Sequence, residues 1–314
     1  MFEQTGDSME HRIKNYTRKE DFIKWKKEVY ITIVEKQLKK PYFKDENCTF
    51  FLFQDDCLEF LPLLQNNSIN MIFADPPYFL SNGGFTCHAG KVASVNKGKW
   101  DVSKGLKETH EFNLKWLKAC QDVLTENGTI WVSGTQHIIF SIGYAMQELG
   151  FKILNDIAWD KVNPPPNLSC RYFTHATETI IWAAKNKQSK HHFNYELMKR
   201  MNNNKQMQSL WSITAPKPDE KIFGKHPTQK PTTLLERIIL ASTKQHDIVL
   251  DPFTGSSTTG VASYRLGRYF IGIDNNKDFL DLSVKRLNFE AKGKHDVKQE
   301  IKNVEKNIEK PVPV

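Results

Sequence analysis

The tetrapeptide Asp75-Pro76-Pro77-Tyr78 joins one carboxylate, two stiff turns and an aromatic ring. The apolar run 71–74 before it predicts a short buried strand. That strand must end here because neither proline can donate a hydrogen bond to a sheet. Ligands bind at the carboxyl ends of strands in open α/β sheets, so the tetrapeptide is a candidate catalytic site. A strand that ends in a Pro-Pro turn with an incidental Asp would look the same.

These groups suit transfer to the planar exocyclic amine of a base. The amine nitrogen is a poor nucleophile because its lone pair is delocalised into the ring. The Asp75 carboxylate can accept one N–H and the Pro76 carbonyl can accept the other, which pulls the nitrogen toward a tetrahedral geometry. Tyr78 offers a face on which a flipped base can stack.

A second motif, Asp-Pro-Phe-Thr-Gly-Ser-Ser-Thr-Thr-Gly at 251–260, follows an apolar strand predicted at 247–251. A glycine turn between a strand and a helix lets a ligand approach the backbone. A phosphate loop is excluded because the motif lacks a Lys before its Ser or Thr, and Gly-x-Gly-x-x-Gly is absent too. Asp274 ends the next predicted strand, 269–273, where an acid can bond ribose hydroxyls or cap a helix.

The segments between these motifs alternate strands and helices. The patterns predict strands at 48–53, 129–132, 151–159 and 177–184, and helices at 58–61, 108–124, 138–149 and after Pro231. This alternation indicates an α/β fold, a doubly wound parallel or mixed sheet with helices on both faces. Residues 80–107 show little periodicity and include the lysines Lys91, Lys97 and Lys99. We expect them to form a mobile basic flap that follows a DNA backbone.

Composition sets broad limits on the partners. The 314 residues carry 44 Lys and Arg against 36 Asp and Glu, a formal charge of +8, which weakly favours a polyanionic partner. Five cysteines without Cys-x-x-Cys spacing favour reduced thiols in a cytoplasm and argue against a zinc site, so we expect no metal. No apolar run reaches membrane-spanning length, so we expect no membrane partner.

The two motifs resemble those of the amino-methyltransferases, which methylate adenine N6 or cytosine N4 in DNA. The resemblance covers about 49–289. The catalytic motif precedes the cofactor motif, which is similar to the β group of the family and implies a circularly rearranged Rossmann-like methyltransferase. Segments 73–84, 163–174 and 224–231 look like the second adenine methyltransferase of DpnII-type restriction systems. Those relatives modify GATC and accept single-stranded DNA.

The resemblance implies S-adenosylmethionine as cofactor. Asp56 would accept the amino group of its adenine, and the backbone N–H of Cys57 would face the same ring. The predicted cofactor-binding residues are Asp56, Cys57, Asp75, Thr228, Gln229, Lys230, Asp251, Phe253, Thr254, Gly255, Ser256 and Asp274. Ser257 stands where members commonly carry Gly, so its turn must have φ below zero or bear mild strain.

The predicted organisation has five parts. They are a charged N-terminal extension (1–45), a catalytic half (46–185), a target-recognition insert (186–225), a cofactor-binding half (226–290) and a C-terminal tail (291–314). The insert interleaves basic and aromatic side chains, which can contact phosphates and bases. The candidate DNA-binding residues are Lys91, Lys97, Lys99, Arg171, Tyr172, Lys199 and Arg200.

The predicted function is methylation of adenine N6 at a short DNA site, with GATC favoured, by base flipping and direct transfer. The resemblance places such an enzyme in a prokaryotic or phage cytoplasm, within a restriction-modification system, acting on double-stranded and also single-stranded DNA. A homodimer and a cognate restriction endonuclease are left open as partners. Cytosine N4 is the close alternative substrate. RNA or protein glutamine methylation and a non-catalytic DNA-binding regulator are more distant ones. Cytosine-C5 methylation is disfavoured because no Pro-Cys dipeptide occurs.

Overall fold

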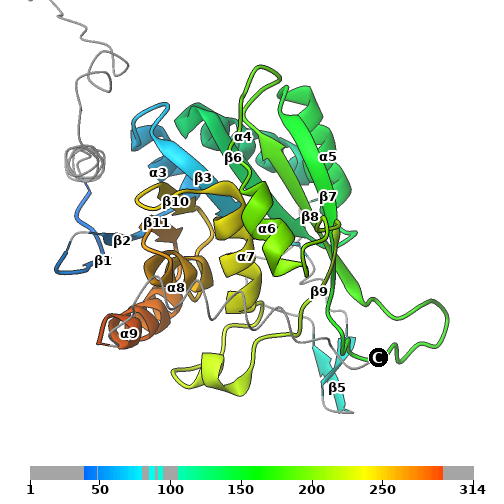
Figure 1. Ribbon diagram of the computed structural model, residues 1–314. Helices are drawn as coiled ribbons and strands as arrows, with labels where there is room; N and C mark the ends of the chain where they lie inside the picture. The colour runs from blue at the N-terminus through cyan, green and yellow to red at the C-terminus, as the bar shows by residue number, and fades with distance from the viewer. Residues whose placement is uncertain (1–38, 48, 80–84, 89–90, 95–104, 293–314) are drawn as a thin grey trace, which may run out of the picture.

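One mixed sheet of nine strands organises the chain (Figure 1). The computed structural model describes residues 39–47, 49–79, 85–88, 91–94 and 105–292. In the large sheet the strand order is β1-β2-β11-β10-β3-β6-β8-β7-β9, and β4 and β5 form a separate hairpin. The strands are β1 (Phe43–Lys44), β2 (Phe50–Gln54), β3 (Ile69–Ala74), β4 (Phe85–His88), β5 (Lys91–Ser94), β6 (Leu124–Gly134), β7 (Lys152–Asp160), β8 (Thr177–Ala184), β9 (Leu210–Ser212), β10 (Ile248–Asp251) and β11 (Tyr269–Asp274).

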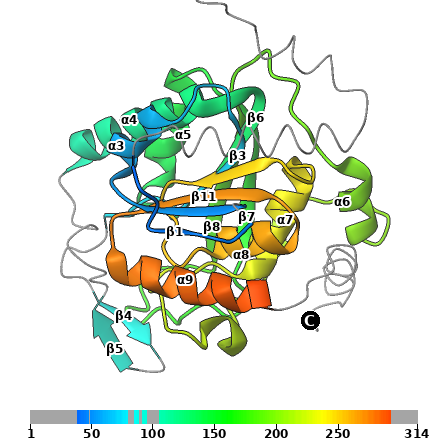
Figure 2. The ribbon, with the colours of Figure 1, turned by 90° about the vertical axis from the view of Figure 1, so that its left-hand side faces the viewer.

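Helices cover both faces of this sheet. They are α3 (Cys57–Phe60), α4 (Leu106–Val123), α5 (Ile139–Glu148), α6 (Tyr195–Met201), α7 (Thr232–Ser242), α8 (Thr258–Arg265) and α9 (Lys277–Lys292), with short 3₁₀ turns η1 (Leu61–Leu63) and η3 (Pro218–Lys221). Figure 2 views the sheet between α3, α4 and α5 on one side and α8 and α9 on the other. The predicted doubly wound mixed sheet is confirmed.

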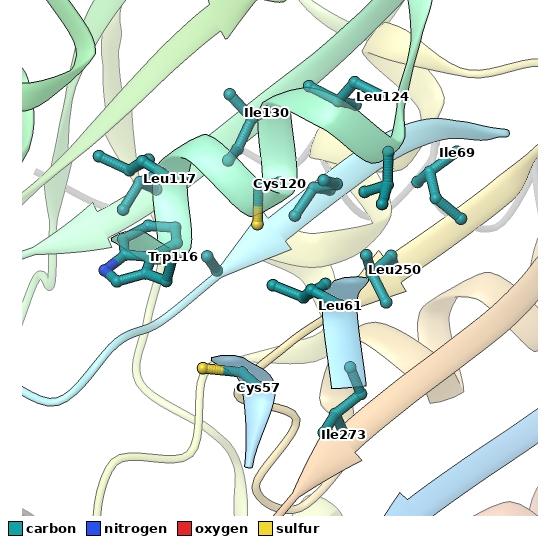
Figure 3. Close-up of a cluster of buried hydrophobic side chains, with 14 of the residues drawn as sticks. Cys57, Leu61, Ile69, Trp116, Leu117, Cys120, Leu124, Ile130, Leu250 and Ile273 are labelled. Atoms are coloured by element: carbon teal, nitrogen blue, oxygen red, sulfur yellow. The ribbon is translucent and has the colours of Figure 1, made fainter. Parts of the chain in front are cut away.

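Each strand divides its side chains between two hydrophobic cores because successive residues of a strand point to opposite faces. In β2, Phe51 and Phe53 pack with α3, α4 and α5, whereas Phe50 and Leu52 pack with α7, α8 and α9. Figure 3 shows the first core, in which Trp116, Leu117 and Cys120 of α4 face strand residues that include Ile130, Leu250 and Ile273. Burial on both sides explains why these strands are almost continuously apolar.

The late strands lie in the middle of the sheet. β10 pairs in parallel with β3 on one side and with β11 on the other, and β11 pairs in parallel with β2. Strands of the predicted cofactor half therefore lie between strands of the predicted catalytic half, in the order β2-β11-β10-β3. The two halves share one sheet and are not separate bodies. The boundaries that we assigned to them stay predictions.

Three details differ from the sequence expectations. Residues 85–88 and 91–94, inside the segment expected to be a flap without periodic structure, pair as the antiparallel hairpin β4–β5. Phe43 and Lys44, assigned to the N-terminal extension, pair with β2 as an edge strand. The predicted insert adds β9, which pairs in parallel with the end of β7. Residues 1–38 of the N-terminal extension and the C-terminal tail beyond 292 lie outside the described residues.

Among the described residues, no helix combines the length and the apolar character needed to cross a membrane. No group of three or more His, Cys, Asp or Glu side chains in this part of the chain could hold a metal ion.

Candidate active site

The two motifs meet because their strands are parallel neighbours. Val249 of β10 lies beside Met71 of β3, and Leu250 lies beside Ile72. The segments that follow both strands, 75–79 and 252–257, consequently emerge at the same edge of the sheet. A cavity of about 570 Å³ opens there. Its volume lies within the range typical of small-molecule sites.

A smaller cavity of about 30 Å³ adjoins the large one, and Asp75, His226, Thr228, Phe253 and Gly255 line both. Every predicted cofactor-binding residue lines one of the two. Seven line the large cavity, namely Asp56, Cys57, Asp75, Thr228, Phe253, Gly255 and Asp274. The others, Gln229, Lys230, Asp251, Thr254 and Ser256, line the small one. The structure thus brings the predicted set together at one edge of the sheet.

Both oxygens of the Asp75 carboxylate accept hydrogen bonds from side chains. The Tyr78 hydroxyl donates to Oδ1 at 2.6 Å, and the Lys230 ammonium donates to Oδ2 at 2.6 Å. The Tyr78 side chain is buried, yet it lines the large cavity. Burial, together with the charges of Asp75 and Glu178, raises the pKa of Tyr78 well above its ordinary value, so the phenol stays protonated and can donate.

Asp75 belongs to a row of four alternating charges. Lys230 Nζ lies 3.6 Å from Glu178 Oε2, and Lys161 Nζ lies 2.5 Å from Glu178 Oε1. Burial opposes the Lys230 ammonium, but the two carboxylates Asp75 and Glu178 outweigh it and raise the pKa of Lys230. The row Asp75, Lys230, Glu178, Lys161 is electrically balanced, which is what allows three of these charges to be nearly buried.

The glycine loop after β10 is held from the neighbouring strand. Gly255 N–H donates to Asp274 Oδ2 at 2.8 Å, and the other carboxylate oxygen accepts from Asn276 N–H, also at 2.8 Å. Gly255 has φ of +50°, and a Cβ built there would lie 2.9 Å from His226 Nε2. The loop therefore needs glycine both for its conformation and for its close approach to His226. Asp274 thus shapes the loop and the turn before α9. It does not cap that helix, because the side chain that accepts from the first turn is Asn276, which bonds Asp278 N–H.

Ser257 follows in the left-handed region, with φ of 51° and ψ of 44°. Of the two alternatives that the sequence left, mild strain is therefore the one the structure shows. The Ser257 hydroxyl is fully buried and lies 2.9 Å from the Thr254 hydroxyl. Ser257 lines neither cavity, so its extra Cβ lies inside the loop.

Asp251 holds the same loop through hydrogen bonds to its carboxylate. Its Oδ1 accepts from Phe253 N–H at 3.1 Å and its Oδ2 from the Thr259 hydroxyl at 2.6 Å. Burial outweighs these bonds and raises the pKa of Asp251 to about 7. The folded protein therefore binds a proton at Asp251 that the unfolded chain has already released above its ordinary pKa.

This shift predicts a pH-dependent loss of stability. The contribution of Asp251 is fully present below its unfolded pKa near 4 and is lost as pH rises through 7. We expect the free energy of unfolding of the wild type to fall relative to Asp251→Asn by about 1.4 kcal/mol per pH unit between pH 4 and 7. Urea titrations of both proteins across this range measure the difference. A constant difference would contradict the assignment.

Asp56 and Cys57 form the wall nearest α3. The Asp56 carboxylate accepts from Leu58 N–H at 2.8 Å and caps this helix. Cys57 is buried beneath it, and burial raises the pKa of its thiol. The Cys57 side chain is thus a core residue. Any contact with a ligand would come from its backbone, as the sequence interpretation supposed.

The predicted DNA-binding residues occupy three places. Arg171 and Tyr172 are exposed on the long loop between β7 and β8, which leaves the sheet at the edge that holds Asp75. Lys199 and Arg200 lie on α6. Asn194, just before α6, donates to Ala241 O at 2.8 Å near the end of α7. Lys91 lies in the hairpin β4–β5, and Lys97 and Lys99 lie outside the described residues.

Sequence reasoning missed several residues that line the large cavity. Phe112, Lys115 and Glu111 come from α4, and Phe279 comes from α9. His226 lies in the segment 224–231, but sequence reasoning assigned it no role. Its ring contacts Phe279 at 4.2 Å between centroids. No local motif marks the α4 residues. The sequence predicts the helix that carries them but does not indicate which of its side chains face the cavity.

The large cavity is rich in acids. Among the residues that the structure describes, six carboxylate side chains line it, against the two basic side chains Lys115 and His226. The acids are Asp55, Asp56, Asp75, Glu108, Glu111 and Asp274. Such a lining favours a ligand with net positive charge. The aromatic rings of Phe79, Phe112 and Phe253 supply flat apolar surface beside these charges.

Comparison with known proteins gives consistent results. The profile of a family described as DNA methylase matches residues 69–285. The type II methyltransferase M2.LlaDCHI of Lactococcus lactis subsp. cremoris is 56% identical over 250 residues, 79% of this chain and 92% of that protein. M2.DpnII of Streptococcus pneumoniae is 55% identical over 252 residues, which are 80% of this chain and 93% of that protein. The crystal structure of the M1.HpyAVI-SAM complex covers 76% of this chain and 99% of its own, at 31% identity and a TM-score of 0.59.

Proposed function

Because the chain belongs to the N6/N4 DNA methylase family, we propose that it forms N6-methyladenine in DNA at a short site, GATC. The protein is a DNA methyltransferase, and its cofactor is S-adenosylmethionine. One observation carries the assignment of the site. The Asp75 carboxylate and the Gly255 loop follow neighbouring parallel strands and line the same two cavities.

The residues of the large cavity fit this cofactor. When bound, S-adenosylmethionine supplies an electrophilic methyl group on its sulfonium, and its net charge is positive. The six carboxylates of the cavity match that charge. Gly255 lines the cavity without a side chain, so a ligand can approach its backbone closely. Asp56, Cys57, Phe253 and Asp274 would hold the adenosine end. Residues Thr228 to Lys230 and the loop 254–256 would lie toward the methionine end.

Asp75, Pro76 and Tyr78 would act on the target base. The Asp75 carboxylate and the Pro76 carbonyl each accept one N–H of the exocyclic amine. This holds the base in place and makes the nitrogen lone pair available for attack on the methyl group. Pro77 keeps the turn stiff, and the Tyr78 ring packs against the flipped base. The amine becomes acidic after transfer, so its proton leaves without a strong base.

Product analysis tests the reaction. The purified protein is incubated with methyl-labelled S-adenosylmethionine and unmethylated DNA, and the DNA is then digested to nucleosides. We expect N6-methyladenine by mass spectrometry. N4-methylcytosine would keep the site and overturn the substrate, since the same two acceptors can hold either amine. Label in neither nucleoside would overturn the proposal.

The loop between β7 and β8 would contact the DNA backbone. Arg171 is exposed there beside Tyr172 and Phe173, which are 60% and 96% exposed. We expect Arg171→Ala to weaken DNA binding and to reduce the slope of log affinity against log salt by about 1. Lys285→Ala is the matched control. Lys285 is an exposed cation on α9, outside the predicted DNA-binding segments. Equal effects of both variants would contradict a specific contact.

The finer partner and location assignments extend this proposal. The enzyme would accept single-stranded as well as double-stranded GATC, serve a cognate restriction endonuclease, and work in a prokaryotic or phage cytoplasm. Phe140 and Tyr144, four residues apart on α5 and 76% and 62% exposed, offer an apolar face for a homodimer. Light scattering of the wild type and of a Phe140→Ser, Tyr144→Ser variant measures that assembly.

A further inference from the structure

The site poses a question that the proposed chemistry alone does not answer. Asp75 must accept an N–H from the base, yet Tyr78 and Lys230 already donate to its two oxygens. An ammonium is a far stronger partner for a carboxylate than a neutral amine is. The Lys230 side chain is only 7% exposed, so water cannot easily take over its charge when the base arrives. Where the base amine takes the place of the ammonium on Oδ2, another buried group has to receive the ammonium.

Glu178 is placed to receive it. Its Oε2 lies 3.6 Å from Lys230 Nζ, so a movement of about 1 Å turns this approach into a normal ionic hydrogen bond. The other oxygen, Oε1, is held by Lys161 at 2.5 Å. Ser133 Oγ lies 3.4 Å from both Glu178 Oε2 and the Tyr78 hydroxyl. Glu178 is 8% exposed, and it comes from β8 rather than from either motif.

We propose that Glu178 is a positioning residue that takes the Lys230 ammonium from Asp75 when the base amine enters. The inference rests on the proposed function, because it assumes that Asp75 accepts an N–H of the base. Lys161 holds Glu178 through Oε1, so Oε2, which also accepts from the Ser133 hydroxyl, faces Lys230. The four charges stay balanced throughout the exchange, so the ammonium is never left buried without a carboxylate.

The consequence of removing Glu178 is specific. In Glu178→Gln the side chain keeps its shape and an acceptor oxygen but loses its charge. Lys230 then has Asp75 as its one strong acidic partner in this row and holds it more tightly. We expect kcat for methyl transfer to fall by about tenfold or more, with the KM for S-adenosylmethionine unchanged within about twofold. Glu236→Gln is the matched control, since Glu236 is a buried carboxylate of α7 that pairs with Arg265 of α8.

A double-mutant cycle separates this role from simple support of the fold. If Glu178 acts by drawing Lys230 away from Asp75, Glu178→Gln has no further effect on kcat once Lys230 is Met. The same fold-loss in both backgrounds would overturn the proposal. A wild type that transfers no methyl group, or an active Asp75→Ala variant, would instead indicate that the proposed function or site is wrong.

A pH profile provides the second readout, and it needs no Lys230 variant. Among the described residues, Asp75, Tyr78 and Glu178 contact Lys230, Lys161 lies beyond Glu178, and Asp251 and His226 line the same small cavity. Without the Glu178 charge, less attraction offsets the cost of burying the Lys230 ammonium, so the pKa of Lys230 falls. Deprotonated Lys230 releases Asp75, so the kcat deficit of Glu178→Gln should shrink as pH rises from 7 to 10. A deficit that stays constant over this range would overturn the proposal.

Discussion

Replacement of Asp75 by Ala is expected to abolish methyl transfer to DNA, with kcat lowered by about 10³-fold or more. Asp75 is the carboxylate that follows β3, at the junction of the two cavities. Without it the amine loses its charged acceptor, and the nitrogen lone pair stays delocalised in the ring. The assay is transfer of label from S-adenosylmethionine to DNA.

Two controls make this result interpretable. Isothermal titration should show S-adenosylmethionine still binding to Asp75→Ala, because six other predicted contacts line the large cavity. Asp75→Asn keeps the shape and one acceptor oxygen, so it should retain more activity than Asp75→Ala. Full activity of Asp75→Ala would remove this residue from the mechanism.

Replacement of Lys230 by Met is expected to cost about 3–5 kcal/mol of the free energy of unfolding. The side chains of Lys230, Asp75 and Glu178 are 7%, 14% and 10% exposed, so loss of the ammonium leaves carboxylate charge buried without its partner. Urea denaturation at pH 7 measures the change. The wild-type Lys230 ammonium is charged at this pH because its pKa is raised above the ordinary value.

Lys118→Met is the matched control for a lysine in an ion pair. Lys118 pairs with Asp122 one turn further along α4, and their side chains are 53% and 46% exposed. Water screens such a pair, so its loss should change stability little. If Lys230→Met proved as mild as Lys118→Met, the buried charge row would contribute nothing to the fold.

The elements near the two motifs could be predicted because local signals mark them. Two prolines end β3, and the glycine turn separates β10 from α8. Apolar runs bounded by turns predicted β8 to the residue. At Ser257 the residue type left two alternatives, and the left-handed backbone of the structure decided between them. In each case the deciding interaction lies within a few residues of the signal.

The charge row could not be predicted because its members are distant in the sequence. Asp75, Lys161, Glu178 and Lys230 meet only through the order β10-β3-β6-β8-β7, which no local pattern encodes. The prediction for Lys230 was a place near the cofactor, and it did not include the hydrogen bond from the Lys230 ammonium to Asp75. The hairpin β4–β5 was missed for a different reason. Its strands, of four residues each, are too short for a clear alternation.

The central claim is that this site methylates an adenine amine in DNA. The most direct test supplies labelled S-adenosylmethionine to wild type and Asp75→Ala with unmethylated DNA, and maps the modified base by single-molecule sequencing. We expect N6-methyladenine within GATC for the wild type and none for the variant. Modification of another sequence would discard the target and keep the chemistry. No methyl transfer to any single- or double-stranded DNA, despite bound cofactor, would contradict the account.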